Sequence, residues 1–264
     1  MTRALGPALA ALTTAALLAG CATSGTEDTG STDPSRTAAA VPEITVYAAA
    51  SLRSTFTELG EMFEARYPTT AVRFNFAGSA DLLTQLSQGA PADVFASADT
   101  ANMTRAVDAG LVAGSPVDFA TNTLTIVTPP GNPRGVNTFA DLAAPGTQVV
   151  VCAPQVPCGA ATATVEQATG VDLTPVSEES SVTDVLGKVT SGQADAGLVY
   201  VTDAAGAGAK VTAVAFPESA GAVNTYPIAV LNESESASAA REFVNLVTGE
   251  AGRTVLTDAG FAAP

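Results

Sequence analysis

Residues 44–68 read ITVYAAASLRSTFTELGEMFEARYP, and this stretch decides the fold class. The apolar run at 44–48 predicts a short strand. The apolar residues after it recur every three or four positions: Leu52, Phe56, Leu59, Phe63 and Tyr67. That spacing predicts an amphipathic helix, which ends at the proline after Tyr67. A strand followed at once by a helix is the repeating unit of α/β folds.

The same alternation continues along the rest of the chain. Further strands are predicted at 72–76, 93–96, 123–128, 148–152, 196–201, 211–216 and 226–231. Further helices are predicted around 82–86 and at 100–108, 160–169, 182–190, 237–246 and 250–259. The last two helices have no strands of their own, so we expect them to return to the first set of strands.

These segments predict an α/β protein of two lobes with mixed, mostly parallel sheets. We assign residues 43–122 and 226–264 to the first lobe and residues 123–225 to the second. The chain would then cross between the lobes twice, near 121–123 and 224–226. Two crossings make a hinge beside a cleft, the arrangement of binding proteins that close over a ligand.

Composition excludes many functions. The chain has 264 residues, 11 basic against 26 acidic, for a formal net charge of −15. A field of that sign repels nucleic acid and anionic lipid. The absence of histidine removes Ser-His-Asp and Cys-His catalysis and every His-ligated metal site.

The N-terminal segment indicates export. Residues 1–20 contain Arg3, no acid and an apolar run at 8–19, the layout of a signal peptide. The run ends in Leu-Ala-Gly followed by Cys21, which resembles the lipobox of bacterial lipoproteins. Residues 21–42 are rich in Thr, Ser, Gly, Ala, Asp and Pro, so we expect a flexible linker that starts at lipidated Cys21. The expected location is extracytoplasmic, anchored to the outer face of the cell membrane, and the alternative is a plain signal peptide with an incidental cysteine.

Hydrogen-bond donors stand at or just before the starts of predicted helices and at the end of one predicted strand. The positions are Ser51, Ser79, Cys158, Val182 and Tyr200. Ligands of α/β sheets bind at the carboxyl ends of strands, where helix N-termini offer free N–H groups and a partial positive charge. Ser51 and Ser79 supply hydroxyls there, and Tyr200 supplies a phenol. Cys158 and Val182 can contribute only their backbone N–H groups.

Each of these residues, taken alone, has an ordinary structural role. A serine at a helix start is most often a cap, and a tyrosine that ends a strand is most often part of the core. The set is unusual because every member donates and none is charged. Such a pocket suits a fully deprotonated dianion and disfavours phosphate, which keeps a proton that needs an acceptor.

Five short motifs carry a resemblance to a known family. They are VYAAASL at 46–52, AGS at 77–79, GAPADVFASA at 89–98, VPCG at 156–159 and GLVY at 197–200. From about residue 43 to 264 the chain resembles the molybdate-binding proteins of bacterial ABC transporters, a branch of the type II periplasmic binding proteins. That family holds its oxyanion with two serines, two backbone amides and a tyrosine. The resemblance therefore implies that Ser51, Ser79, Cys158, Val182 and Tyr200 bind molybdate or tungstate.

The resemblance also implies the partners. We expect delivery of the ion to the membrane permease of a molybdate ABC transporter, with no cofactor and no metal other than the molybdenum of the bound oxyanion. We expect a monomer that is not an enzyme and does not bind nucleic acid.

Two alternatives for function remain open from the residues. A sulfate- or thiosulfate-binding protein would follow the same dianion logic. A serine hydrolase with Ser51 as nucleophile lacks an activating base, because there is no histidine and Lys188 and Lys210 lie in no recognisable catalytic motif.

The two later cysteines are close in sequence. Five residues separate Cys152 from Cys158, and in an exported protein this spacing favours a disulfide over two buried thiols. The bridge would stiffen the turn that presents the Cys158 amide.

Overall fold

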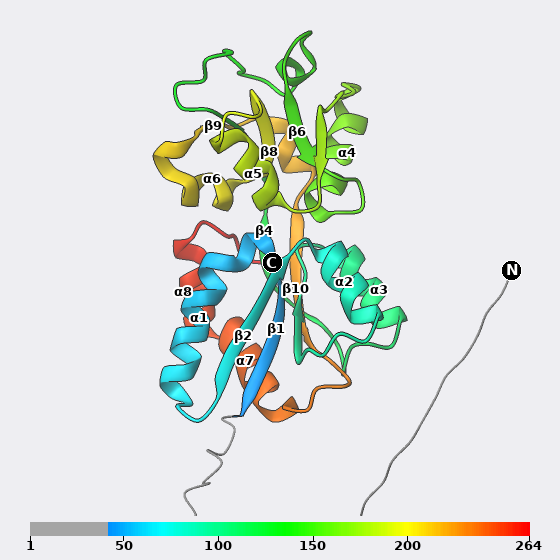
Figure 1. Cartoon of the computed structure of the whole chain (residues 1–264), viewed down its shortest axis with the longest axis vertical. Helices are drawn as coiled ribbons and strands as arrows, with labels where there is room; N and C mark the ends of the chain where they lie inside the picture. The colour runs from blue at the N-terminus through cyan, green and yellow to red at the C-terminus, as the bar shows by residue number, and fades with distance from the viewer. Residues whose placement is uncertain (1–41) are drawn as a thin grey trace, which may run out of the picture. The chain divides into compact units, whose positions relative to one another are not determined.

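The computed structural model describes residues 42–264, and its strands form two five-stranded sheets (Figure 1). The predicted signal peptide, Cys21 and nearly all of the linker lie outside the described residues. Within residues 42–264, no helix is both long enough and apolar enough to span a bilayer.

The first sheet has the strand order β2-β1-β3-β10-β4. Its members are β1 (Glu43–Ala49), β2 (Ala71–Ala77), β3 (Val94–Ala96), β4 (Val117–Asn122) and β10 (Asn224–Val230). β1 pairs in parallel with β2 and β3, whereas β10 pairs antiparallel with β3 and β4.

The second sheet has the order β7-β6-β8-β5-β9. Its members are β5 (Leu124–Thr128), β6 (Val149–Cys152), β7 (Ser177–Glu179), β8 (Ala196–Tyr200) and β9 (Thr212–Val214). β6 pairs in parallel with β7 and β8, and β5 pairs antiparallel with β8 and β9. Both sheets are therefore mixed, with two parallel and two antiparallel pairings each. The parallel share is smaller than expected because β5 and β10 enter their sheets from the crossings and not through a right-handed helical connection.

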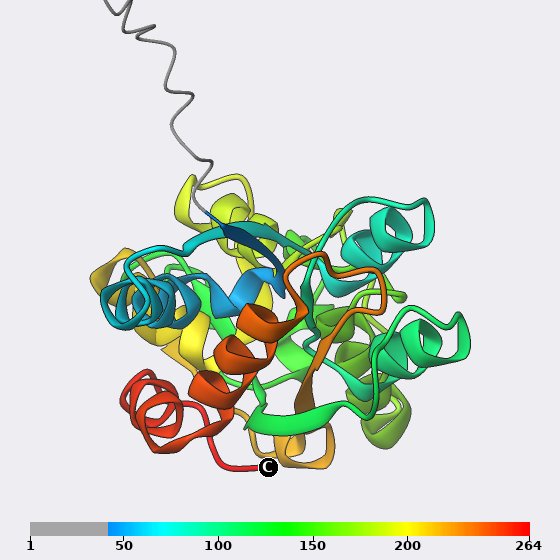
Figure 2. The same cartoon turned by 90° about the horizontal axis from the view of Figure 1, so that it is seen from below.

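Helices cover both faces of the first sheet. α1 (Arg53–Arg66), α7 (Ala237–Thr248) and α8 (Glu250–Asp258) lie on one side, and α2 (Ser79–Ser87) and α3 (Thr100–Asp108) lie on the other (Figure 2). Alternate residues of β1 feed the two cores: Val46 belongs to the cluster under α1, and Tyr47 to the cluster under α2. Phe243 of α7 packs edge-on against Phe56 and Phe63 of α1, which ties the C-terminal helices to this sheet.

The second sheet carries α4 (Pro157–Thr169), α5 (Val182–Thr190) and α6 (Val201–Ala207). Within residues 42–264 there are also short 3-10 turns: η1 (Ala50–Leu52), η2 (Ala140–Ala143), η3 (Gly208–Lys210) and η4 (Pro217–Gly221). The strands β4, β7 and the helix α6 were not predicted from the sequence, and α4 begins three residues earlier than the predicted helix.

Two connections join the sheets. One residue, Thr123, separates β4 of the first sheet from β5 of the second. The return runs from β9 through η4 into β10, which begins at Asn224. Asn122 and Asn224 are paired across β4 and β10, so the two crossings lie side by side.

Candidate anion-binding site

The five residues expected to bind the ligand line one cavity between the two groups of elements. Ser51 and Ser79 come from the first lobe, and Cys158, Val182 and Tyr200 from the second. The other lining residues are small or apolar: Ala49, Ala50, Gly78, Ala98, Val156 and Pro157. The cavity is about 10 Å³, which is room for one water-sized group. The lining therefore forms a small site between the two sheets.

Ser79 lines the cavity with a hydroxyl proton that is available for a ligand. It is the first residue of α2, and its side chain is buried. Its Oγ accepts a hydrogen bond of 3.0 Å from the backbone N–H of Ala98. Because that bond occupies a lone pair, the hydroxyl proton is free for a ligand.

Ser51 is held by a residue that sequence reasoning missed. Ser51 lies in η1, the turn that leads into α1, and its Oγ is 3.1 Å from the hydroxyl of Tyr226. Tyr226 lies in β10 and is fully buried, which raises the pKa of its phenol and keeps it protonated. Tyr226 can therefore donate to Ser51, which leaves the proton of Ser51 for a ligand. In the sequence, Tyr226 reads only as the start of a strand.

The N-terminus of α4 presents the Cys158 amide. Val156 is the N-cap and Pro157 the first helical residue, so the first N–H group of the helix belongs to Cys158. No side chain caps this end. A disulfide joins Cys158 to Cys152 at the end of β6, which fixes the first turn of α4 to the sheet.

The N-terminus of α5 presents the Val182 amide. Ser181 is the N-cap, and its Oγ accepts from the N–H of Asp184 at 3.3 Å while donating to the Asp184 carboxylate at 2.6 Å. This cap satisfies the third N–H of the helix and leaves the first, that of Val182, for a ligand.

Tyr200 provides the clearest sign of a ligand. It ends β8, is 1% exposed, and its hydroxyl has no hydrogen-bond partner within residues 42–264. Burial raises the pKa of this phenol well above its ordinary value, so the group stays a donor at any physiological pH. A buried donor without a partner is costly, and a bound anion would satisfy it.

Charged side chains stay away from the cavity. All residues that line it lie within the described range, and none of them is charged. Arg53 follows Ser51 closely, but its guanidinium lies over the ring of Phe76, 4.6 Å from the centroid. Lys188 pairs with Glu179 at 3.2 Å. Neither base can activate Ser51, and the positive potential at the cavity comes from helix N-termini.

One carboxylate lies just behind the site. Asp203, in the first turn of α6, accepts from the backbone N–H of Tyr200 at 3.1 Å. Burial raises the pKa of Asp203 to about 7.

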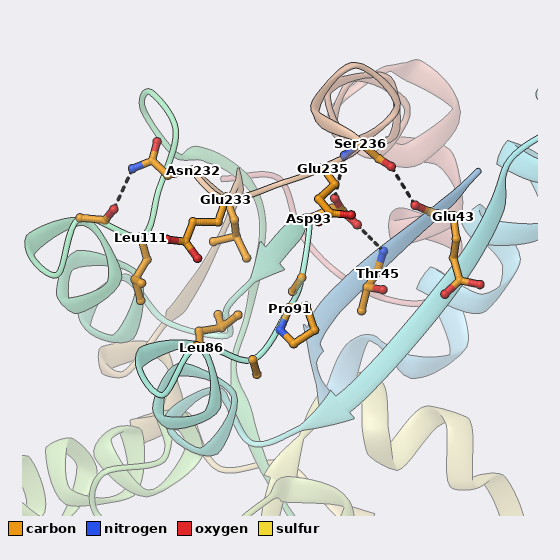
Figure 3. Close-up of a pocket in the computed structure, with 15 residues that line it drawn as sticks. Glu43, Thr45, Leu86, Pro91, Asp93, Leu111, Asn232, Glu233, Glu235 and Ser236 are labelled. Carbon is orange, nitrogen blue, oxygen red and sulfur yellow. Dashed lines mark hydrogen bonds between the residues drawn. The ribbon is translucent and has the colours of Figure 1, made fainter. Parts of the chain in front are cut away.

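A larger cavity of about 460 Å³ lies in the first lobe, and its chemistry is wrong for an anion (Figure 3). Carboxylates surround it: Glu43, Asp93, Glu233 and Glu235. Asp93 already accepts from the N–H of Thr45 at 2.7 Å and of Ser236 at 3.3 Å. In the described part of the chain, no three acidic or cysteine side chains are grouped so as to hold a metal ion.

The chain belongs to a family of binding proteins. Residues 44–262 match the family model of the bacterial extracellular solute-binding proteins, and the chain is a member of that family. It is therefore a solute-binding protein with the two-lobed type II fold and not an enzyme.

Its relatives narrow the class. The chain is 56% identical over 253 residues to the molybdate-binding protein ModA of Mycobacterium tuberculosis (strain H37Rv), covering 96% of this chain and 97% of that protein. The periplasmic molybdate-binding protein of Azotobacter vinelandii has the same fold, with a TM-score of 0.73 and 23% identity. The match covers 84% of this chain and 99% of that protein. The sulfate-binding protein SubI of M. tuberculosis also shares the fold, with a TM-score of 0.70 and 22% identity. The match covers 84% of this chain and 87% of that protein.

Proposed function

We propose that this protein captures molybdate or tungstate outside the cytoplasmic membrane and delivers it to an ABC permease. In this proposal Ser51, Ser79 and Tyr200 donate hydroxyl protons to the ion, and Cys158 and Val182 donate backbone N–H groups. The relative with 56% identity is named a molybdate-binding protein, and the match covers nearly the whole length of both chains. This likeness supports the choice of ion.

One observation carries the proposal: the groups that face the cavity are neutral donors. Ser79 Oγ is already an acceptor for Ala98, and Ser51 Oγ is bonded to Tyr226. A tetrahedral dianion without protons can accept from every donor. Phosphate near neutral pH keeps a proton that would meet another donor and lose a hydrogen bond.

Sulfate is the nearest rival of molybdate. It has the same charge and shape, so the donor pattern accepts both ions. The relative with 56% identity is named a molybdate-binding protein, whereas the sulfate-binding protein SubI shares the fold at 22% identity. We therefore expect molybdate and tungstate to bind more tightly, and sulfate or thiosulfate binding is the second candidate function.

Calorimetric titration with molybdate, tungstate, sulfate and phosphate tests the proposal. We expect tight binding of the first two, weaker binding of sulfate and no measurable binding of phosphate. Phosphate affinity comparable to that of molybdate would contradict the donor-only site. Tighter binding of sulfate than of molybdate would show that the protein is a sulfate- or thiosulfate-binding protein, the second candidate function.

A further inference from the structure

The backbone conformation at position 78 does not require a glycine. Gly78 is the N-cap of α2, with φ −61° and ψ 142°, a conformation open to every residue. Serine, threonine, asparagine or aspartate at this position would satisfy an N–H group of the first turn, and no side chain does so here. The reason for glycine must lie in what surrounds it.

The surroundings belong to the other lobe. A Cβ on Gly78 would lie 2.0 Å from the carbonyl oxygen of Ser180 and 3.6 Å from Cγ1 of Val156. Ser180 lies between β7 and α5, and Val156 is the N-cap of α4. The nearest obstacle is a backbone oxygen, which cannot rotate away as a side chain can. The two lobes therefore meet at the Cα of Gly78.

This contact lies among the ligand donors. Gly78 immediately precedes Ser79 in the first lobe. Ser180 stands two residues before Val182, and Val156 stands two residues before Cys158. Because Gly78 has no side chain, the start of α2, which carries Ser79, can lie against the segments that lead into α4 and α5.

A second tie holds the lobes together at the edge of the cavity. The side-chain amide of Asn224, at the return crossing, donates to the carbonyl of Ala98 at 2.9 Å and reaches the carbonyl of Pro157 at 3.4 Å. Ala98 belongs to the first lobe and Pro157 to the second, and both line the cavity. This bridge ties the lobes at the hinge side, whereas Gly78 lies where the lobes touch beside the expected donors.

We propose that Gly78 determines lobe closure: its lack of a side chain lets the lobes approach until donors from both reach one oxyanion. This inference rests on the proposed function. Real Cβ atoms stay at least 3.0 Å from such neighbours, so any side chain would separate the segments by at least about 1 Å. Hydrogen bonds have a working range of about 2.7–3.2 Å, so the amide bonds from Cys158 and Val182 would be lost.

The test compares Gly78→Ala and Gly78→Ser with the wild type. Titration with sodium molybdate measures affinity, and small-angle X-ray scattering with and without molybdate measures closure. We expect both variants to bind at least tenfold more weakly and to contract less on adding the ion. In the absence of the ion, their melting temperatures should stay within a few degrees of the wild type, because only the cap of α2 changes. Gly187→Ala is the matched control: it lies in α5 with no atom within 4 Å of a Cβ, so it should bind and contract like the wild type.

Serine separates two explanations. If weak binding came from poor capping of α2, Gly78→Ser would restore affinity, and that result would overturn the inference. Wild-type affinity and contraction in Gly78→Ala would overturn it as well, while molybdate binding by the wild type would still support the proposed function. If the wild type binds none of the four oxyanions, the proposed function fails and the inference fails with it.

Discussion

At the scale of single residues, the site separates side chains that donate from side chains that do not. Ser51, Ser79 and Tyr200 line the cavity and would donate hydroxyls in the proposed site, whereas Val182 would donate a backbone N–H that does not depend on its side chain. Substitution can therefore test whether the site is built as described.

We expect Ser51→Ala, Ser79→Ala and Tyr200→Phe each to weaken molybdate binding by roughly ten- to hundredfold. Each change deletes one hydrogen bond to a charged ligand, worth about 1.5–3 kcal/mol. Val182→Ala keeps its amide and should bind within about twofold of the wild type. Calorimetric titration of each variant with molybdate measures the affinities. If all three variants that lack a hydroxyl bind like the wild type, the ion binds elsewhere.

If Val182→Ala loses as much affinity as Ser79→Ala, the site does not depend on backbone N–H groups at helix N-termini.

Residues that act through their neighbours escape sequence reasoning. Ser51 and Ser79 were predicted because their hydroxyls stand at strand-to-helix junctions, and Tyr200 because its phenol ends a strand. Tyr226 was not, because its role depends on a 3.1 Å contact with a residue 175 positions away. In the sequence, Gly78 is only one residue of the AGS motif at 77–79, because the carbonyl that excludes its Cβ belongs to the other lobe.

At the scale of elements, prediction followed periodicity. α5 begins at Val182 and ends at Thr190, which are the bounds predicted from the sequence. β7 was missed because it is an edge strand of three polar residues, and β4 because its burial does not alternate. α6 was missed because its Ala- and Gly-rich sequence has no apolar stripe. The early start of α4 matters most, because it places the Cys158 amide in the first turn.

The buried carboxylate of Asp203, at the junction of β8 and α6, makes the stability of the fold depend on pH. Burial raises the pKa of Asp203 to about 7 from an ordinary value of 3.8. Between about pH 4 and pH 7 the folded protein therefore keeps a proton that the unfolded chain releases, so the free energy of unfolding falls as pH rises through this window. Asp203→Asn keeps an acceptor for the Tyr200 N–H and removes the titration.

We expect the Asp203→Asn variant to gain roughly 1–3 kcal/mol of stability over the wild type at pH 8 and to match it near pH 4. Urea unfolding of both proteins across this range measures the difference. Parallel stability profiles would show that the carboxylate of Asp203 is ionised in the folded state as it is in water.

At the scale of the molecule, the fold follows from the alternation of strands and helices, and the site follows from where the chain crosses. β4 runs into β5 through one residue, and β10 returns beside it, so both sheets direct strand ends and helix starts toward one cavity. The antiparallel strands β5 and β10 were harder to foresee, because strand direction depends on the crossings and not on local pattern.

The remaining prediction concerns how the whole protein is held at the membrane. Cys21 follows Leu-Ala-Gly at the end of an apolar run that is too short to span a bilayer, so we propose that a lipid on this cysteine is the anchor. Cys21→Ala should then move the protein from the membrane fraction to the medium or the soluble extract, while molybdate affinity stays at the wild-type value, because every proposed ligand residue lies at Ser51 or beyond. Fractionation followed by titration of the released protein makes both measurements. A variant that stays with the membrane would exclude lipidation of Cys21 as the anchor, and a wild type that is already soluble would identify residues 1–20 as an ordinary cleaved signal peptide.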